Sequence, residues 1–292
     1  MLKTIGHTLL AGIALLALSS GLMAQGVVNT PAQVLTPFGY RDAANVHLVP
    51  SGFDLTAMPD GQVRMANAAT GARVDFPKWE EAAVAPFSDS GWISYASWLN
   101  KTGSPVKSFT TAWTVPAAPT SYNGQTLFLF NSIEPNSGTA ILQPVLQYGP
   151  SAAGGGKNWA VASWYVVGTQ AYYSSLVTVS AGQSLTGVIT FASKTNKKFN
   201  YTCAFTGISG TNFSINQIPQ LTWCTETLEV YGVNQCSEFP NTAYTQMSGI
   251  NVRTKAGTPS FNWGITDAQT SCGVQTTVVT NGATNAAVDI YY

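Results

Sequence analysis

The sequence predicts an all-β fold, a two-sheet antiparallel β-sandwich. Short runs rich in β-branched and aromatic residues follow one another from residue 88 to the end of the chain. Gly, Asn, Ser and Pro separate these runs, and such turn signals at intervals of about 8–12 residues are typical of sandwiches and barrels. No stretch shows the 3.6-residue period of an amphipathic helix. About 200 residues are enough for one such domain.

The expected strands follow directly from these runs. The first run ends at Pro116, which lacks the N–H that would continue a ladder. Residues 194–197 (Lys-Thr-Asn-Lys) separate two runs and are expected to form an exposed hairpin turn. In chain order, the runs are residues 109–115, 126–130, 140–148, 159–167, 175–179, 184–192, 198–205, 220–230, 251–254, 274–280 and 287–292.

Three segments differ in composition. Residues 1–24 are typical of a secretory signal peptide, with Lys3 ahead of a short apolar stretch that ends at Leu18. Residues 25–86 are rich in proline and carboxylates and predict a prosegment or a loosely packed N-terminal extension. Residues 87–292 are expected to form the sandwich. The apolar stretch is shorter than the about 20 residues of a spanning helix, so we expect a secreted protein, extracellular or periplasmic, that does not bind membranes.

Composition excludes several function classes. The chain has 13 Lys+Arg, 13 Asp+Glu and two His, so its formal net charge is zero and nothing indicates binding to nucleic acid. His47 is the sole histidine after the signal peptide, which excludes a zinc site rich in histidine. Acid–base chemistry therefore depends on carboxylates. We expect a monomer without metal or cofactor.

The cysteines predict structural bridges. Four remain after export, at positions 203, 224, 236 and 272, and no CxxC spacing occurs. An even number in an oxidising compartment favours two disulfides, for which three pairings are possible.

The run Thr139-Ala140-Ile141-Leu142-Gln143 resembles the segment that carries the catalytic glutamine of the glutamic peptidases of the eqolisin family. Further segments resemble that family in the same order, over roughly residues 90–240. They are Ser90-Gly91-Trp92, Trp113-Thr114-Val115-Pro116, Ile133-Glu134 (Ile-Asp in the family), Ala162-Ser163-Trp164-Tyr165, the run of residues 177–185, and Ser237-Glu238-Phe239-Pro240.

The family's second catalytic residue is a glutamate that follows an aromatic residue by three positions. Residues 221–226 match that strand best, with Trp223 as the aromatic residue and Glu226 as the glutamate. The resemblance implies a concanavalin A-like jelly roll with a cleft, in which Glu226 acts as general acid and base and Gln143 stabilises the oxyanion. It also implies polypeptide substrates, an acidic optimum and no covalent intermediate.

A carboxylate and an amide suit this chemistry, because the carboxylate transfers protons and the amide N–H binds an oxyanion. Period-two geometry puts Glu226 and Glu229 on opposite faces of one strand, so only one of them looks into a cleft. Glu226 keeps the aromatic residue in register, and Glu229 is the alternative. Glu134, Trp164 and Trp223 are expected to contact substrate or to support the pair.

Two departures from the family favour other functions. Pro144 directly follows the glutamine, and the acidic residue expected beside Trp164 is absent. The main alternative is therefore a lectin-like sandwich that binds glycans through its aromatic cleft without catalysis. A glycosidase with two carboxylates is a third hypothesis, which would need Glu134 about 5–10 Å from Glu226.

Overall fold

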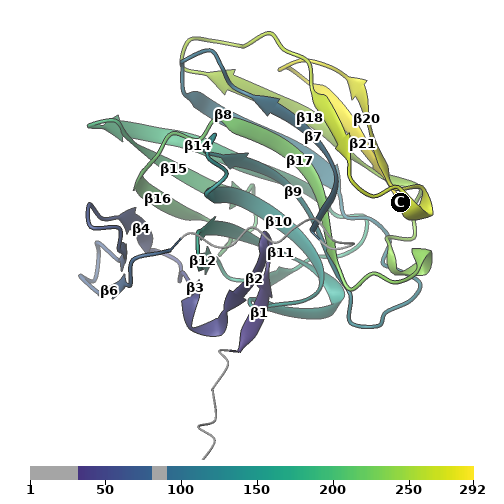
Figure 1. Ribbon diagram of the computed structural model, residues 1–292, viewed down its shortest axis with the longest axis horizontal. Coiled ribbons are helices and arrows are strands. Elements are labelled where there is room, and N and C mark those ends of the chain that lie inside the picture. Colours follow the sequence, from purple (N-terminus) through teal and green to yellow (C-terminus); the bar gives the residue numbers. More distant parts are fainter. Residues whose placement is uncertain (1–31, 81–90) are drawn as a thin grey trace, which may run out of the picture. The chain divides into compact units, whose positions relative to one another are not determined.

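The computed structural model describes residues 32–80 and 91–292, which belong to one compact unit, Pro31–Tyr292. The fold of this part is all-β, and the predicted two-sheet sandwich is confirmed (Figure 1). The predicted signal peptide and the predicted boundary at residues 86–87 lie outside the described residues. Within the described ranges, no helix has the length and hydropathy needed to cross a membrane.

The first large sheet has nine strands. From one edge to the other the order is β19 (Gly264–Asp267), β7 (Gly91–Leu99), β17 (Trp223–Tyr231), β9 (Thr126–Glu134), β10 (Ala140–Ser151), β11 (Gly154–Val167), β12 (Gln170–Tyr173) and β3 (Val46–Leu48), with β13 (Val177–Thr178) also paired to β11. Four neighbouring strands, β9 to β12, are consecutive in the chain, and β17 is inserted between β7 and β9.

The second large sheet has ten strands. Its order is β20 (Gln275–Thr280), β21 (Ala286–Tyr291), β18 (Tyr244–Thr254), β8 (Val106–Thr114), β14 (Ser184–Thr195), β15 (Lys198–Phe205), β16 (Phe213–Ile218), β4 (Asp54–Ala57), β5 (Val63–Ala66) and β6 (Arg73–Phe76). A separate hairpin consists of β1 (Gln33–Thr36) and β2 (Gly39–Asp42). The short 3-10 helices are η1 (Ala43–Asn45), η2 (Cys236–Glu238) and η3 (Ser271–Gly273).

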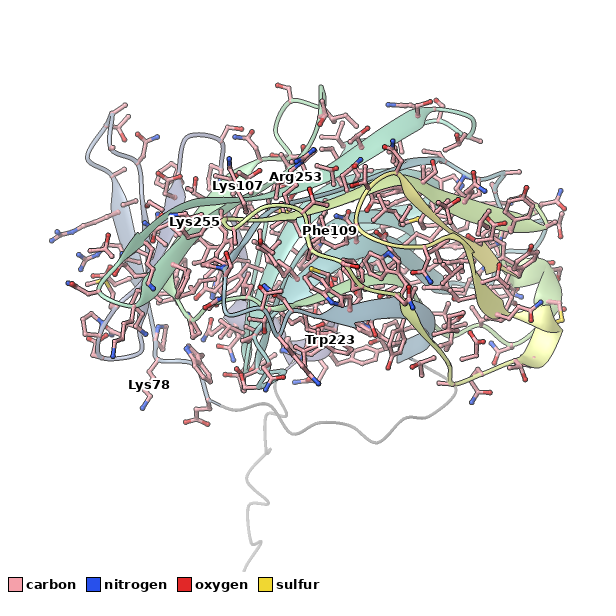
Figure 2. The ribbon with its side chains drawn as sticks, turned by 90° about the horizontal axis from the view of Figure 1, so that it is seen from above. Lys78, Lys107, Phe109, Trp223, Arg253 and Lys255 are labelled. Carbon is pink, nitrogen blue, oxygen red and sulfur yellow. A yellow bond between two sulfur atoms is a disulfide. The ribbon has the colours of Figure 1, made fainter. Side chains whose placement is uncertain are left out.

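The main core lies between the two large sheets. It contains Phe109 and Ile189 of the ten-stranded sheet and Leu129 and Leu142 of the nine-stranded sheet. Figure 2 shows Phe109 between the layers, with Lys107 on one side and Trp223 on the other. Alternating side chains of each strand enter this core, as the period of two requires.

A second, smaller cluster covers the face of the nine-stranded sheet that points away from the other sheet, here called the outer face. The cluster consists of Phe128, Phe130, Ile141, Val145, Ala162, Trp164, Val166, Ala171 and Tyr231. All nine residues of β9 are therefore buried. A strand buried on both faces has a continuous apolar run rather than an alternating one, as the Leu127–Phe130 segment of β9 does.

The N-terminal segment, residues 32–80, is an integral part of the fold. β3 extends the nine-stranded sheet by pairing parallel with β12, and β4 extends the ten-stranded sheet by pairing parallel with β16. Figure 1 shows the β1–β2 hairpin beside β10 and β11. The expectation of a loosely packed extension is wrong because its strands satisfy the backbone groups of two sheet edges. These two parallel pairs are also the exception to the predicted antiparallel order.

The predicted hairpin turn between β14 and β15 is present. Asn196 and Lys197 connect the two strands with φ of 50° and 65°. Two consecutive residues with positive φ are typical of the type I′ turn that matches the twist of a hairpin.

One of the two expected disulfides forms. Cys236 and Cys272 are bonded, with their Cα atoms 5.3 Å apart. Cys203 and Cys224 are free and buried. They come from β15 and β17, which lie in different sheets, and packed sheets are about 10 Å apart, too far for the Cα separation of a disulfide. The expectation of a second bridge is therefore wrong.

Gly187 permits the close approach of the two sheets above the centre of β9. A Cβ at this position would lie 2.3 Å from Asn131 Oδ1 and 2.7 Å from Pro144 Cγ. Neither neighbour moves freely, since both belong to central strands of the opposite sheet.

We expect Gly187→Ala to lower the free energy of unfolding by about 1–3 kcal/mol, the usual cost of overpacking. Thermal or urea unfolding of the full chain measures this change. Gly156→Ala is the matched control, because a Cβ on this strand glycine would have its nearest neighbour at 3.9 Å. Equal stability of the two variants would contradict the packing argument.

Candidate active site

Glu226 faces the core between the sheets. On β17 it lies opposite Asn131 of β9 and Ala96 of β7, and its neighbours on the same face, Cys224 and Leu228, belong to the main core. Its Oε1 accepts a hydrogen bond of 2.5 Å from the hydroxyl of Thr111, which is on the opposite sheet. The side chain is fully buried.

Gln143 lies on the other face of the same sheet. Its cross-strand partner is Trp164 of β11, a member of the outer cluster. The expectation that Gln143 and Glu226 open onto one cleft is therefore wrong, because the period of two directs them to opposite faces. The glycosidase hypothesis fails for the same reason, since it needs Glu226 near Glu134.

Two other carboxylates share the outer face with Gln143. Glu229 of β17 lies opposite Phe128, a member of the outer cluster. Glu134 of β9 lies opposite Trp223 of β17, and the Trp223 ring is 5.9 Å from the ring of Trp92, which packs against the outer cluster. The structure thus places Gln143, Glu134, Trp164 and Trp223 on one face and adds Glu229 to them.

Register puts Glu134 close to Gln143. Strands β10 and β9 pair with one constant offset at Leu142 and Ile133 and again at Val145 and Phe130. With that offset, Glu134 is the diagonal neighbour of Gln143 on the adjacent strand, and such neighbours are about 7–8 Å apart. Their side chains project from the same face.

The amide of Gln143 is buried without hydrogen-bond partners in the described part of the chain. The side chain is 0% exposed, and neither its Nε2 nor its Oε1 has a partner there. The β9–β10 ladder has no pair at Gln143 or Pro144, since proline cannot donate. An unpaired buried amide costs free energy unless a ligand or water binds it.

The two outer-face carboxylates both hold protons more tightly than usual. Burial, and then the nearby charge of Glu229, raises the pKa of Glu134 well above its ordinary value. Burial also raises the pKa of Glu229 to about 7, against the opposing effects of Tyr231, the Phe38 backbone, Trp92 and Arg41. Like charges close together do not both ionise readily, so the charge of Glu229 adds to the effect of burial on the pKa of Glu134.

Aromatic rings surround the carboxylates. Trp92 contacts the rings of Tyr95, Phe130 and Trp223 at centroid distances of 5.4, 5.7 and 5.9 Å. Farther along the face, Trp164 stacks on Tyr173 at 4.9 Å. These rings supply a wide apolar surface on both sides of the polar groups.

The β1–β2 hairpin covers this face. The backbone N–H of Phe38 donates to Glu229 Oε1 at 2.8 Å, and the Tyr231 hydroxyl donates to the same oxygen at 2.6 Å. The Ala152 N–H donates to the carbonyl of Leu35 at 2.7 Å, which ties β1 to the end of β10. Leu35 and Phe38 both pack against the outer cluster.

His47 has a structural role: it holds the N-terminal segment in place. It does not orient a nucleophile. Its ring stacks on Phe76 at 4.0 Å, and its Nε2 lies 3.0 Å from Gln170 Oε1. Gln170 also donates to Asn45 at 3.2 Å. Burial lowers the pKa of His47, while the bond to Gln170 acts in the opposite direction. A catalytic triad built on this histidine has no support.

In residues 32–80 and 91–292, no group of three or more His, Cys, Asp or Glu residues is arranged to hold a metal ion.

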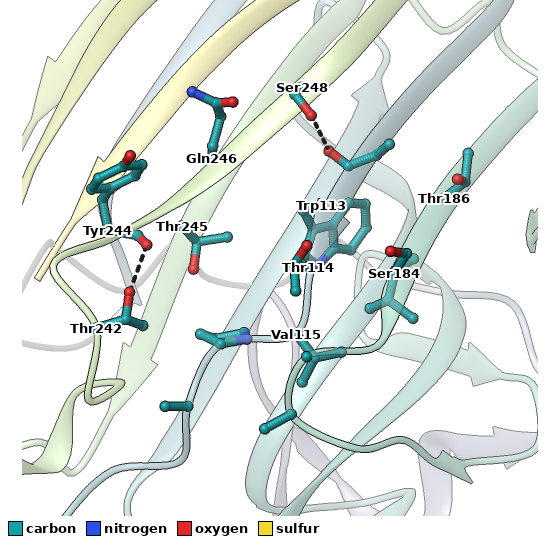
Figure 3. A pocket seen from close by; sticks show the side chains of 16 residues that line it. Trp113, Thr114, Val115, Ser184, Thr186, Thr242, Tyr244, Thr245, Gln246 and Ser248 are labelled. Carbon is teal, nitrogen blue, oxygen red and sulfur yellow. Dashed lines mark hydrogen bonds between the residues drawn. The ribbon is translucent and has the colours of Figure 1, made fainter.

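A groove of about 560 Å³ lies on the ten-stranded sheet, away from the outer face (Figure 3). Its walls carry the side chains of Thr114, Ser184, Thr186 and Gln246, and its rim carries Tyr244. None of the residues that line it is charged or titrates near neutral pH. The groove therefore has no group for acid–base catalysis.

Two solved structures of peptidases are similar to this fold. Scytalido-glutamic peptidase, solved with a peptide-based transition-state analogue, matches with a TM-score of 0.47 and 16% identity over 70% of this chain and 98% of its own. SCP-B, a member of the eqolisin family solved with the tripeptide Ala-Ile-His, matches with a TM-score of 0.40 and 13% identity over the same shares.

At identities of 16% and 13%, these two matches concern the fold alone. No protein-family model matches the chain, and no curated protein matches it. The similarity concerns the architecture, and the roles of individual side chains stay predictions.

Sequence reasoning missed two parts of the site. Glu229 was only the alternative, because the match of Trp223 to the family's aromatic residue fixed the choice of Glu226. Phe38 was not considered, since nothing in its local sequence shows that the hairpin folds back over residues almost 200 positions away. Which of Glu226 and Glu229 shares a face with Gln143 depends on the register between β17, β9 and β10. The sequence does not show this register.

The pH dependence of stability tests whether the Glu226 side chain is buried between the sheets. Burial raises its pKa well above the ordinary 4.5, while Thr111 opposes the shift. The folded state therefore binds a proton that the unfolded state releases above pH 4.5, so this contribution to stability is present in acid and is lost as the pH rises.

We expect Glu226→Gln to remove the fall in the free energy of unfolding that Glu226 causes as the pH rises. For one bound proton, this fall amounts to about 1.4 kcal/mol per pH unit. Unfolding of wild type and variant between pH 4 and pH 8 measures it, and the variant should gain stability relative to wild type as the pH rises. Parallel pH profiles would show that Glu226 is solvated.

Proposed function

We propose that the chain is the precursor of an exported endopeptidase that works with the outer-face residues Gln143, Glu134 and Glu229. The observation that carries the proposal is the amide of Gln143, which has no hydrogen-bond partner among the described residues and is buried on the same face as two carboxylates with raised pKa. A segment of polypeptide already lies over these groups. The fold similarity to peptidases is compatible with the proposal and does not carry it.

The three side chains divide the chemistry of peptide hydrolysis. The carboxylate of Glu134 takes a proton from a water molecule, whose oxygen adds to the scissile carbonyl carbon. The amide N–H of Gln143, diagonal to Glu134, stabilises the resulting oxyanion. As the C–N bond breaks, the carboxylic acid of Glu229 donates its proton to the leaving nitrogen. Proton exchange with solvent then restores both carboxyl groups.

The hydrogen bond from Phe38 supports the proposal that Glu229 serves the leaving nitrogen. Its carboxylate already lies 2.8 Å from a backbone nitrogen of the bound segment. A general acid must be within hydrogen-bond reach of the atom it protonates. Glu229 acts as an acid only while it is protonated, so we expect the activity of the open form to fall as the pH rises past the pKa of this carboxyl, in accord with an acidic working range.

The N-terminal segment is the prosegment in this proposal. Its hairpin closes the outer face, and β3 and β4 fix it to the edges of both sheets. The closed form also keeps Glu134 buried, and this burial raises the pKa of the proposed base. Release of the segment admits water, lowers the cost of ionisation and opens the site. The disulfide accords with an oxidising compartment outside the cytosol.

The decisive experiment measures cleavage of an unfolded protein at pH 3–6 by the full chain, nicked at a protease site inserted between residues 80 and 91. We expect Gln143→Ala to lower kcat about 10²–10³-fold, the usual effect of losing an oxyanion donor. Glu134→Gln and Glu229→Gln should each lower kcat at least as much, because a neutral amide transfers no proton.

Glu226→Gln is the matched control, since it is the same change on the opposite face of β17. It should keep the activity of wild type. Loss of activity in Glu226→Gln with retention in Glu229→Gln would reverse the assignment. Absence of cleavage by the correctly folded chain, once the nicked N-terminal segment has dissociated, would overturn the peptidase proposal.

Glycan binding is the second candidate, and the groove on the ten-stranded sheet favours it. Val115 forms both backbone hydrogen bonds toward β14, with Gln183 and Gly182. The backbone N–H and C=O of Thr114 therefore point to β18, whose ladder with β8 ends at Ser248 and Ala112. The hydroxyls of the groove and Tyr244, which is 42% exposed, suit a neutral sugar.

Titration calorimetry with neutral oligosaccharides tests this candidate. Binding should be lost in Gln246→Ala and Tyr244→Ala and should not depend on salt, since no charge lines the groove. Tyr40→Ala is the control, as an exposed tyrosine of the hairpin (56% exposed) that does not line the groove. No heat with any neutral oligosaccharide would remove glycan binding from consideration.

A further inference from the structure

We infer that the outer-face site prefers a large aromatic residue immediately after the bond it cleaves, and that Trp92 is the residue that recognises this side chain. The inference rests on the proposed function and goes beyond it by naming the substrate class. It is drawn from the segment that occupies the site.

The Phe38 residue occupies the position of such a side chain. Its backbone nitrogen is the donor to Glu229 Oε1. In the proposed mechanism Glu229 protonates the leaving nitrogen, so the residue that carries this nitrogen is the first one after the scissile bond. The side chain of Phe38 therefore marks where the substrate's corresponding side chain lies.

The ring of Phe38 meets Trp92 edge to face. Their centroids are 6.1 Å apart and their planes make an angle of 66°. T-shaped pairs at this distance are a favourable aromatic geometry. An aliphatic side chain would still bury apolar surface here but would lack this contact.

Neighbouring aromatic rings fix the position of the Trp92 side chain. Tyr95, Phe130 and Trp223 contact it on β7, β9 and β17. Its side chain also interacts with Glu229 and lowers the pKa of that carboxyl, so the ring lies beside the proposed acid. A platform supported on three adjacent strands loses little conformational freedom on binding, which favours selectivity.

Charge adds to the selection. Glu229 and Glu134 line the same face, and Arg41, which offsets Glu229 in the closed form, belongs to the hairpin and leaves with it. An acidic side chain at this position would face two carboxylates without a cation. We therefore expect aspartate and glutamate to be the poorest residues after the cleaved bond.

Backbone geometry explains why the segment is an inhibitor rather than a substrate. Phe38 and Gly39 have φ of 83° and 101°, in the turn between β1 and β2. Peptidase substrates that add to a sheet bind as extended chains. The turn presents the aromatic ring and the N–H to the site while it withholds an extended scissile peptide.

The first test is the sequence of cleavage sites. Nicked full chain is incubated with a peptide library, and the residue after each cut is identified by mass spectrometry. We expect Phe, Tyr and Trp to be favoured over Leu by about three- to ten-fold in kcat/KM. Trp92→Leu should remove this preference with less effect on Leu substrates, and Trp92→Phe should restore part of it.

The second test does not require activity. Hydrogen exchange of residues 33–42 in the intact chain reports how firmly the hairpin is bound. Phe38→Ala should raise the exchange rate about ten-fold, and the matched variant Phe38→Tyr should behave as wild type.

The outcomes separate the two claims. Cleavage without aromatic preference, or unchanged exchange in Phe38→Ala, overturns the subsite at Trp92 and leaves the peptidase proposal standing. Absence of cleavage with faster exchange in Phe38→Ala overturns the peptidase proposal and limits the Trp92 pocket to binding its own prosegment.

Discussion

The structure depends on one constraint, the burial of the central strands β9, β10 and β17 on both faces. A sheet in a sandwich needs only its inner face covered, and its other face is commonly solvated. Here the outer face is apolar as well, with Phe128, Phe130 and Trp164 along its length. Something must cover it, and the hairpin at the start of the described chain does so. The N-terminal segment is thus a requirement of the fold in its closed form.

The same constraint sets the chemistry of the carboxylates. Glu134, Glu226 and Glu229 are all fully or almost fully buried, in a chain with few cations to pair with them. Burial without a cation favours the neutral acid. On the inner face this is permanent, and Glu226 is a structural group bonded to Thr111. On the outer face it lasts only while the hairpin is bound. Accessibility thus distinguishes the structural from the reactive carboxylates.

Both candidate functions agree with a chain poor in charge, and they use different surfaces. Hydrolysis needs titratable groups, which lie on the outer face of the nine-stranded sheet under the hairpin. Glycan binding needs neutral donors and acceptors, which line the open groove of the ten-stranded sheet. The two sites lie on separate sheets, so the presence of one does not exclude the other. A peptidase with a separate sugar-binding groove would accord with both observations.

Much of the fold was predictable, because the residues that favour a strand, and the turn residues that end it, are visible in the local sequence. The runs at 140–148 and 198–205 match β10 and β15 closely, since β-branched and aromatic residues there end at glycine, proline or asparagine turns. Other strands, such as β7 and β16, were not predicted. Their polar residues break the apolar run, and only pairing with neighbours makes them strands.

The residue types of the site were predictable from the sequence. Which of these residues lie on the same face was not. The sequence by itself determined that a glutamine and a few carboxylates had to carry any acid–base chemistry, because His47 stood alone. It also determined that Glu226 and Glu229 point in opposite directions, since side chains alternate along a strand. Which of the two faces Gln143 depends on the register between β17, β9 and β10. That register is set by long-range pairing and by the hairpin that covers one face, so only the tertiary structure decided it.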